Sequence, residues 1–519
     1  MLSEKPDMQA KACSLSGLLE AAAGALPKLS EFDCAPQPSL ETVTITSITP
    51  DSRKVGPGSL FVAVPGVHVD GRNFIEAAVK AGAAAVLSTP DAEARAAGVP
   101  FLASQHPRRL LARLAAALYA PKQPTVEAAI TGTNGKTSVA EFVRQIWAAS
   151  GRRAASIGTL GVRSDSLKTA SGLTTPDPST LMAQVGALAE AGVSHLAVEA
   201  SSHGLDQYRL DGMRFSIAAF TNLSRDHLDY HPTEEAYFFA KARLFGELLP
   251  PYGAAVLNVD DARSDMLADI LWSRGIHTVL VGRSAKAADI RLTESHLEAG
   301  GQSLTVEVGG VKHSVFLPLL GDFQADNFLV ALGVAIETGV SLDDILRAAS
   351  QLKGVPGRME YAGETATGGK VVLDFAHTPA GLETVLRAAR KHTSGRVAVV
   401  FGCGGDRDKG KRPQMGAIAH ALADTVYVTD DNPRSEDAAT IRSEIMAACN
   451  GAHNIADRTT AVRRAVADLG AGDILIVAGK GHETGQIIGD QIIPYSDHEA
   501  VYAALQACGG QAHKGVTAC

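Results

Sequence analysis

The stretch VEAAITGTNGKTS (126–138) decides the fold. Its first six residues form a mainly apolar run that is typical of a buried parallel strand. Apolar side chains then recur three and four residues apart over 139–147, as on one face of a helix. A strand, a glycine turn, a Lys-Thr pair and a helix in this order predict a loop whose backbone N–H groups bind phosphate. The alternative is a tight turn that carries a surface lysine.

Within this loop the side chains suggest separate roles. Lys136 would reach the β- and γ-phosphates of a nucleotide, and the Thr137 hydroxyl would hold Mg²⁺. The pattern departs from the common G-x-x-x-x-G-K-[ST] motif, because Ile130 stands where the first glycine would be. A GTPase is disfavoured, since the sequence has no guanine-reading Asn-Lys-x-Asp. The predicted nucleotide-binding residues of the loop are Gly132, Thr133, Asn134, Gly135, Lys136, Thr137 and Ser138.

Similar apolar runs recur along the chain, separated by segments of helical length. They predict an α/β protein built on mostly parallel sheets with flanking helices. Proline and glycine in YAPKQPT (119–125) and LKGVPGRMEY (352–361) divide the chain into three predicted domains, 1–122, 123–354 and 355–519. Alternating residues over 286–316 predict a β-hairpin within the second domain.

Composition excludes several classes of function. The 519 residues carry 48 Lys and Arg against 56 Asp and Glu, a net charge of −8 that disfavours general nucleic-acid binding. Six cysteines without a CxxC pair argue against zinc and favour a reducing cytoplasm. We expect no signal peptide and no membrane span, and the first ~40 residues are expected to be a variable lead-in.

Polar residues follow two further apolar strands. Glu199 ends the run SHLAVEAS (194–201), and His227 lies in the cluster TNLSRDHLD (221–229). The carboxyl ends of parallel strands face the ligand crevice, so both residues are candidates for binding a metal or for catalysis. The alternative for Glu199 is a solvated loop residue.

Lys241 shares the apolar face of its helix with Tyr237 and Phe245, four residues before and after it. A buried ammonium is costly unless it is paired or loses its charge. The residue pattern alone therefore favours a lysine whose ammonium reaches solvent.

Motifs from Asp51-Ser52-Arg53 to Tyr495-Ser496-Asp497 resemble the Mur ligases, the ATP-dependent amide-bond ligases that build the peptide of the bacterial cell wall. The most specific are TGTNGKTS, EASSHGLDQYRL, TNLSRDHLDYH, AKARLF, GDFQADN, GRME, DFAHTP, FGCGGDRDKGKRP, DDNPR and AGKGHE. The sequence is most similar to the members that add meso-2,6-diaminopimelate to the D-glutamate of UDP-N-acetylmuramoyl-L-alanyl-D-glutamate. This resemblance implies an N-terminal UDP-substrate domain, a central P-loop ATP-binding domain and a Rossmann-like C-terminal domain that binds the amino acid. It also implies ATP as co-substrate, Mg²⁺, and a monomer.

The resemblance assigns roles that the residues alone do not. Lys241 matches a lysine that CO₂ converts to a carbamate (N6-carboxylysine), so the implied magnesium ligands are Thr137, Glu199, His227 and carbamylated Lys241. The implied catalytic residues are Lys136, Glu199, His227 and Lys241. Further ATP-binding positions are Asn327, Arg358, Asp374 and His377. Phe375 departs from the family pattern, where tyrosine is more usual.

The resemblance also implies two sets of substrate contacts. The UDP-substrate would be bound by Ser52, His68, Val69, Asp70, Thr174, Thr175, Ser201, Gln207 and Arg209. Diaminopimelate would be bound by Arg407, Asp431, Asn432, Pro433, Arg434, Gly479 and Glu483. The planar fork of Arg434 could grip the distal carboxylate that lysine lacks, and Glu483 could accept from the distal ammonium. The alternative for the Asn-Pro-Arg segment is a turn with a surface arginine.

The expected reaction transfers the γ-phosphoryl group of ATP to the D-glutamate side chain, and the amine of diaminopimelate then attacks the acyl phosphate. One alternative is a sibling amide ligase that uses L-lysine, or a folylpolyglutamate synthetase. Another is a nucleotide-dependent binding protein that has no turnover.

Overall fold

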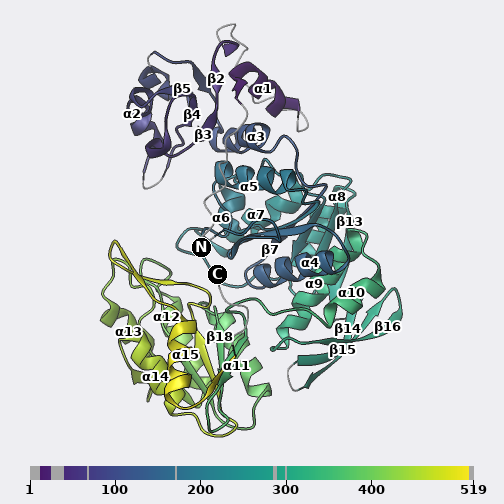
Figure 1. Cartoon of the computed structure of the whole chain (residues 1–519), viewed down its shortest axis with the longest axis vertical. Helices are drawn as coiled ribbons and strands as arrows, with labels where there is room; N and C mark the ends of the chain where they lie inside the picture. Colours follow the sequence, from purple (N-terminus) through teal and green to yellow (C-terminus); the bar gives the residue numbers. More distant parts are fainter. Residues whose placement is uncertain are drawn as a thin grey trace. The chain divides into compact units, whose positions relative to one another are not determined.

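A computed structural model of the chain describes residues 12–24, 40–66, 69–96, 98–169, 172–284, 289–298 and 301–513. Strands alternate with helices along most of it, which confirms the predicted α/β class (Figure 1). The chain divides into two compact units. Unit 1 comprises Met1–Thr131, Gly151–Ala218 and Ala240–Ala254, and unit 2 comprises Gly132–Ser150, Ala219–Phe239 and Ala255–Cys519. The predicted borders of three domains stay predictions.

The first sheet of unit 1 is parallel, in the order β3 (Ser47–Thr49), β4 (Ser59–Val62), β5 (Ala83–Ser88), β6 (Phe101–Ala103). Alternate residues of β4 point to opposite faces. Leu60 and Val62 pack in one core with α1 (Leu15–Gly24) and α3 (Pro107–Tyr119), while Phe61 packs with α2 (Ile75–Lys80). Two covered faces explain why these strands are apolar throughout. A short antiparallel pair joins β1 (Cys13–Ser14) to β2 (Thr44–Ile45).

The second sheet region of unit 1 has the order β7 (Val126–Thr131), β10 (His195–Glu199), β8 (Ala154–Gly158), β9 (Gly161–Arg163). The first three strands are parallel, and β9 is antiparallel to β8. Helix α5 (Pro178–Glu190) is capped by Asp177, whose carboxylate accepts from two backbone N–H groups of its first turn. Glu199 is the last residue of β10, as the sequence predicts.

The middle region of unit 2 packs α4 (Lys136–Ala149) against α9 (Phe323–Glu337). Next to β13 (His277–Gly282) lie β14 (Ile290–Glu298), β15 (Gly301–Val308) and β16 (Val311–Leu317), and the last three pair antiparallel. The hairpin predicted over 286–316 is therefore a three-stranded ribbon. Helices α8 (Ser264–Ser273) and α10 (Leu342–Ala349) also belong to this unit, and β11 (Ile217–Phe220) and β12 (Ala254–Asn258) contain residues of both units.

The last sheet of unit 2 has seven strands in the described residues. Its order is β21 (His453–Asn454), β20 (Thr425–Val428), β19 (Val397–Phe401), β22 (Ile474–Ala478), β18 (Lys370–Asp374), β17 (Glu360–Glu364), β25 (Gln511–Ala512). The first five strands pair parallel, β17 pairs antiparallel with β18, and β25 pairs antiparallel with β17. This is a mostly parallel, doubly wound sheet of the kind that the resemblance implies.

Helices cover both faces of this sheet (Figure 1). One core contains α11 (Pro379–Lys391), α12 (Lys411–Leu422) and α13 (Ala438–Met446), and the opposite core contains α14 (Arg458–Ala467) and α15 (Asp497–Ala507). Successive residues of β19 alternate between the two cores, Val399 in the first and Val400 in the second. In sheets of this kind, ligands bind at the carboxyl ends of the strands.

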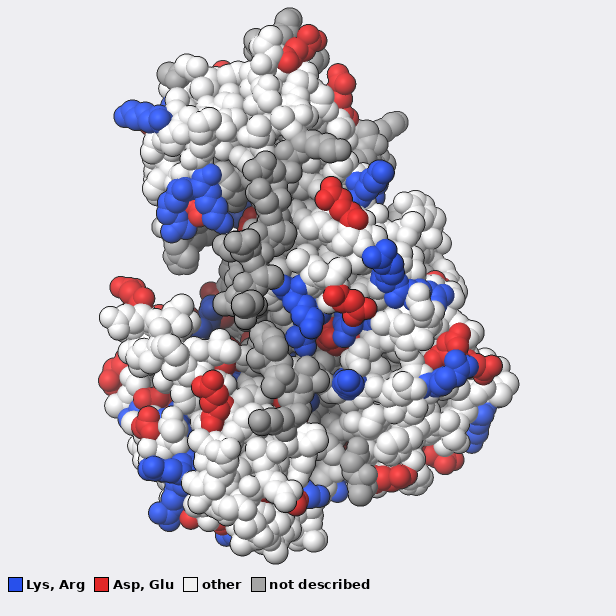
Figure 2. All heavy atoms as spheres, viewed as in Figure 1, with Lys and Arg blue, Asp and Glu red and all other residues white. Residues whose placement is uncertain are grey.

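Basic and acidic side chains are interspersed on the face that Figure 2 shows. That mixture agrees with a net charge of only −8 on 519 residues. Within the part of the chain that the structure describes, the helices are too short or too polar to cross a membrane.

Candidate active site

The predicted phosphate loop has backbone conformations that require glycine. Gly132 has φ 143° and Gly135 has φ 87°, and Gly135 immediately precedes α4. A Cβ on Gly132 would lie 2.0 Å from Thr221 Oγ1, and one on Gly135 would lie 2.3 Å from Asn327 Oδ1. Both glycines therefore allow the loop to approach neighbouring polar side chains closely.

Hydrogen bonds hold this loop in shape. The ammonium of Lys136 folds back over the loop and donates to the carbonyl oxygens of Gly132 (3.0 Å) and Thr133 (2.8 Å). The backbone N–H of Asn134 donates to Asn222 Oδ1 at 3.0 Å, and the Thr133 hydroxyl lies 3.1 Å from the Tyr237 hydroxyl. The polar cluster after β11 therefore supports the loop, in addition to any role in binding a ligand.

A cavity of about 330 Å³ lies beside the loop in unit 2. It is lined by seven of the predicted ATP-binding residues, namely Asn134, Gly135, Ser138, Asn327, Arg358, Asp374 and His377. The guanidinium of Arg358 reaches within 3.5 Å of the Thr137 hydroxyl. Residues that are far apart in the sequence thus form one candidate nucleotide pocket.

Asp374 ends β18 inside this pocket and is almost fully buried. Burial raises the pKa of its carboxyl to about 6, although Arg358 and two backbone N–H groups oppose the shift. Those N–H groups belong to Met359 and Ala376, and each donates to a carboxylate oxygen of Asp374 at a distance of 2.7 Å. Met359 adopts φ 48°, a strained conformation for a non-glycine residue.

A second cavity, of about 200 Å³, adjoins the loops after β19, β20 and β22. It brings together His227 and all but one of the predicted diaminopimelate-binding residues, namely Arg407, Asp431, Asn432, Arg434, Gly479 and Glu483. The remaining residue, Pro433, does not line the cavity. A Cβ on Gly405 would lie 1.9 Å from Pro433 O, so glycine is needed where these two loops meet.

Arg434 is held at the wall of this cavity. Its backbone has φ 52°, and its Nη1 donates to Gly405 O at 2.8 Å. Burial lowers the pKa of Arg434, and the nearby Arg407 lowers it further. Two guanidinium groups at one cavity favour an anionic group there.

Sequence reasoning missed three residues of this cavity region. Lys411 donates to His377 O at 2.8 Å and lines the cavity, as does Asp226. Burial raises the pKa of Asp226, but His227, His377 and Lys411 outweigh burial and hold it below its usual range. Lys480 lies fully buried behind the cavity. All three stand inside motifs that the resemblance uses, which was the available signal.

In unit 1, five of the predicted UDP-substrate residues form one hydrogen-bonded network next to Glu199. The Thr175 hydroxyl donates to Glu199 O (2.8 Å), and Arg209 donates to Thr175 O (2.7 Å). Both carboxylate oxygens of Glu199 accept from Thr159, through its backbone N–H and its hydroxyl. The other members of the network are Thr174, Ser201 and Gln207.

The other predicted UDP-substrate residues lie near the first sheet of unit 1. The carboxylate of Asp70 accepts from the backbone and side chain of Arg72, and this hydrogen bonding holds the pKa of Asp70 below its usual range. Val69 is exposed, and Ser52 begins a short 3₁₀-helix. His68 lies outside the described residues.

Lys241 lies in α7 (Glu234–Arg243), and only 1% of its surface is exposed. Its ammonium does not reach solvent, so the interpretation from the residue pattern alone is wrong. The helix buries it because Tyr237 and Phe245 on the same face are buried as well.

The residues that the structure describes contain no group of three or more His, Cys, Asp and Glu side chains arranged to hold a metal. The predicted magnesium set is chemically different from such a group. The hydroxyl of Thr137, the carboxylate of Glu199 and a carbamate on Lys241 offer the hard oxygen ligands that Mg²⁺ prefers, although the imidazole of His227 is less typical. The donor types fit Mg²⁺, and the ion itself stays a prediction.

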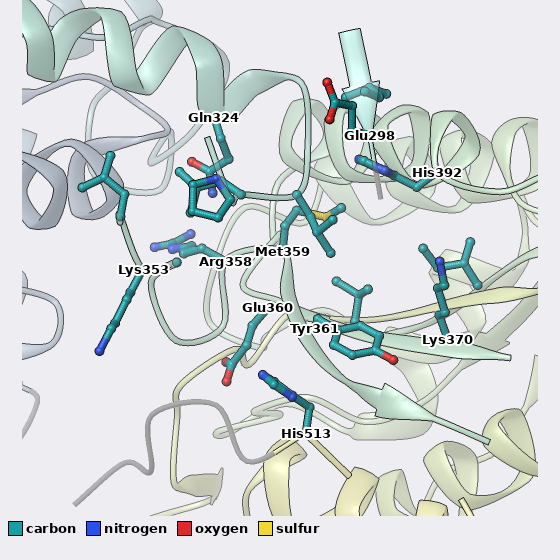
Figure 3. A pocket seen from close by; sticks show the side chains of 18 of the residues that line it. Glu298, Gln324, Lys353, Arg358, Met359, Glu360, Tyr361, Lys370, His392 and His513 are labelled. Atoms are coloured by element: carbon teal, nitrogen blue, oxygen red, sulfur yellow. The ribbon is translucent and has the colours of Figure 1, made fainter. Parts of the chain in front are cut away.

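Another cavity, of about 900 Å³, is much larger, yet Arg358 is the one predicted site residue that lines it. Figure 3 shows Gln324 and Arg358 on one side of it, Glu298 and His392 on another, and Lys353 directed away from the rest. Most of the predicted ATP-binding and diaminopimelate-binding residues line the two smaller cavities instead.

Comparison with known proteins agrees with this arrangement. Three family models match: "Mur ligase family, catalytic domain" over 44–119, "Mur ligase middle domain" over 130–335, and "Mur ligase, glutamate ligase domain" over 357–481. A protein of Bradyrhizobium diazoefficiens named UDP-N-acetylmuramoyl-L-alanyl-D-glutamate--2,6-diaminopimelate ligase is 50% identical, over 91% of this chain and 97% of its own length. The protein of the same name from Agrobacterium fabrum is 50% identical, over 95% and 99%.

Solved structures extend the comparison. One with the same name as these two relatives is 32% identical, with a TM-score of 0.67 over 96% of this chain and 99% of its own. A folylpolyglutamate synthase of Mycobacterium tuberculosis reaches a TM-score of 0.58 at 20% identity, over 69% and 88%, and so shares the fold alone. From its sequence and its structure, the chain belongs to the Mur ligase family.

Proposed function

We propose that the protein is an ATP-dependent amide ligase that adds meso-2,6-diaminopimelate to the D-glutamate of UDP-N-acetylmuramoyl-L-alanyl-D-glutamate. The observation that carries the proposal is the second cavity, where Arg434 and Arg407 stand beside Glu483 and Asn432. The names of the relatives that are 50% identical support the same substrates. The ranges of the three matched models also support domains over 1–122, 123–354 and 355–519.

The reaction proceeds in two displacements. A D-glutamate carboxylate oxygen attacks the γ-phosphorus of ATP, which releases ADP and leaves an acyl phosphate. The amine of diaminopimelate then attacks the acyl carbon, and inorganic phosphate leaves as the amide forms. Water would hydrolyse the acyl phosphate, so the walls of the site must exclude it.

Side chains of the chain itself supply charge and orientation. Lys136 places an ammonium at the loop that receives the phosphates, and Arg358 adds a guanidinium beside the Thr137 hydroxyl. Thr137, Glu199, His227 and carbamylated Lys241 would hold Mg²⁺, which supplies charge neutralisation for phosphoryl transfer. The network of Thr175 and Arg209 is the proposed contact for the UDP-substrate.

The amino-acid cavity fits a zwitterionic group better than a lone cation. The distal carbon of diaminopimelate carries a carboxylate and an ammonium, which match Arg434 and Glu483. L-lysine has no distal carboxylate, so it would leave the half-buried guanidinium of Arg434 without a carboxylate partner. We extend the proposal to a monomeric enzyme in the cytoplasm, where ATP and UDP-linked precursors are available.

The test supplies ATP and the UDP-linked dipeptide with diaminopimelate, L-lysine or L-glutamate, and detects the product by mass. We expect one product, the diaminopimelate-containing tripeptide, with phosphate release that requires all three substrates. A product with lysine or glutamate would reassign the protein to a sibling ligase. Failure to release phosphate with any amino acid would favour a binding protein without turnover.

A further inference from the structure

Lys480 lies in the loop after β22, and its side chain is fully buried. Its ammonium donates to Gly485 O (2.8 Å), Asn432 Oδ1 (2.9 Å) and Glu483 Oε2 (3.2 Å). An ammonium has three N–H donors, so each of them has an acceptor here. A carboxylate oxygen of Asp431 lies 3.9 Å away. A buried cation with this many oxygen partners is part of a built site.

The ammonium is one of three groups that fix how the Asn432 amide is oriented. Oδ1 of Asn432 accepts from Lys480 and from the backbone N–H of Ile487 at 3.0 Å. Its Nδ2 donates to Glu483 Oε2, also at 3.0 Å. A flipped amide would turn its NH₂ group toward two other donors, which is unfavourable. With Lys480 present, only one orientation of Asn432 satisfies all these groups.

Lys480 also holds the Glu483 carboxylate in place through a hydrogen bond to one of its oxygens. Oε2 receives both hydrogen bonds, from Lys480 and from Asn432. The described residues donate no hydrogen bond to Oε1, and 35% of the side chain is exposed at the cavity. Glu483 therefore offers one oxygen to a ligand while the other is held from behind. Without the ammonium, a single amide donor would hold this carboxylate.

The same lysine joins two loops. Gly485 begins β23 (Gly485–Ile488), which pairs with β24 (Gln491–Pro494). The backbone N–H of Arg434 donates to Ile487 O at 3.0 Å, and Gln486 Nε2 donates to Asp431 O at 2.6 Å. The hairpin thus lies against the loop that carries Arg434. Lys480 contacts the hairpin through Gly485 and the loop through Asn432.

We propose that Lys480 is a positioning residue that makes the amino-acid cavity selective for a distal carbon bearing both an ammonium and a carboxylate. The assignment rests on the proposed function. Lys480 offsets the charges of Asp431 and Glu483, so the cavity does not attract a lone cation strongly. Without the charge of Lys480, the negative charges of Asp431 and Glu483 are less well neutralised. The side chains of Asn432 and Glu483 also lose a hydrogen bond that holds them in position. Binding of diaminopimelate then weakens, while the penalty against L-lysine decreases.

The test compares K480M, which removes the charge and shortens the unbranched side chain by one atom, with wild type and with K122M. Lys122 is an exposed lysine of unit 1 and serves as the matched control. For K480M we expect the KM for diaminopimelate to rise about tenfold or more, with the KM for ATP and for the UDP-substrate within about twofold. The ratio of kcat/KM for diaminopimelate over L-lysine should fall by about tenfold. K122M should match wild type in each value.

A merely structural role would give a different result. It would lower kcat for every substrate together and leave each KM and the selectivity ratio unchanged, which would overturn the assignment. K480Q guards against misfolding, because it keeps two donors in a smaller, neutral side chain, and wild-type selectivity in K480Q would also overturn it. If the wild-type protein fails to use diaminopimelate, the proposed function is refuted, and so is the role assigned to Lys480. If the wild-type protein is active and the Lys480 variants keep its KM values and selectivity, only the role assigned to Lys480 is refuted.

Discussion

The guanidinium carbon of Arg358 lies 4.5 Å from the centre of the Phe375 ring. Both residues line the candidate nucleotide cavity, and the same guanidinium reaches Thr137 at the start of α4. A cation over an aromatic face is attracted by the ring itself, with no need for a hydroxyl. Phenylalanine can therefore replace the tyrosine that is more usual in the family, because the contact with Arg358 uses only the ring.

Phe375→Tyr should leave the KM for ATP within about twofold of wild type, whereas Phe375→Ala should raise it several-fold. The stacked contact is worth roughly 0.5–2 kcal/mol, and alanine removes it. Steady-state kinetics at saturating amino acid would measure both variants. If tyrosine harms ATP use more than alanine does, ring stacking is not the role of Phe375.

Arg434→Asn should abolish most use of diaminopimelate and leave nucleotide binding nearly unchanged. Asparagine is the better probe than alanine, because it tolerates the φ of 52° at this position. Loss of a partly buried charged partner costs about 2 kcal/mol, which is roughly thirtyfold in affinity. Steady-state kinetics would give the KM for diaminopimelate, and calorimetry would give the affinity for ADP as the measure of nucleotide binding. An unchanged KM for diaminopimelate would remove Arg434 from the specificity argument.

The sequence predicts well those features that depend on local pattern. The run before Gly132 and the helix face after it determine a strand, a loop and a helix, because each is encoded within a few residues. Strand ends such as Glu199 and Asp374 are also predictable, since a polar residue after a buried run stands out. Their partners in space were inferred from the resemblance alone.

Features that depend on distant residues were not predictable. Lys480 reads as an ordinary loop lysine, because its partner Asn432 lies 48 residues away in the chain. The burial of Lys241 has the same cause, since spacing along one helix does not reveal what covers that helix. The pattern alone therefore gives the wrong interpretation of Lys241, whereas its actual exposure is 1%.

Lys241→Ala should be nearly inactive and should recover part of its activity when a small carboxylate such as acetate is added. The added anion would replace the oxygens of the proposed carbamate. Lys241→Arg is the matched control, because arginine keeps the positive charge and cannot form a carbamate, so it should be inactive without recovery. Turnover assays with and without acetate would decide the point. Full activity of either variant in the absence of acetate would refute the carbamate.

Glu127→Gln should make the stability of the protein less dependent on pH between 5 and 8. Glu127 is fully buried on β7, the strand that leads into the phosphate loop, and one of its oxygens accepts from the backbone N–H of Arg214 at 2.7 Å. Burial raises the pKa of its carboxyl to about 8. In the unfolded chain the pKa is about 4.3, so between these values the folded protein retains a proton that the unfolded chain releases.

Stability therefore falls as pH rises through this window, by up to about 1.4 kcal/mol per pH unit from this group, and the loss ends above the folded pKa. Glutamine does not titrate, so the difference in unfolding free energy between Glu127→Gln and wild type should grow in favour of the variant from pH 5 to pH 8. Urea unfolding at four pH values in this range would measure that difference. A constant difference across the range would show that Glu127 is ionised in the folded protein at low pH.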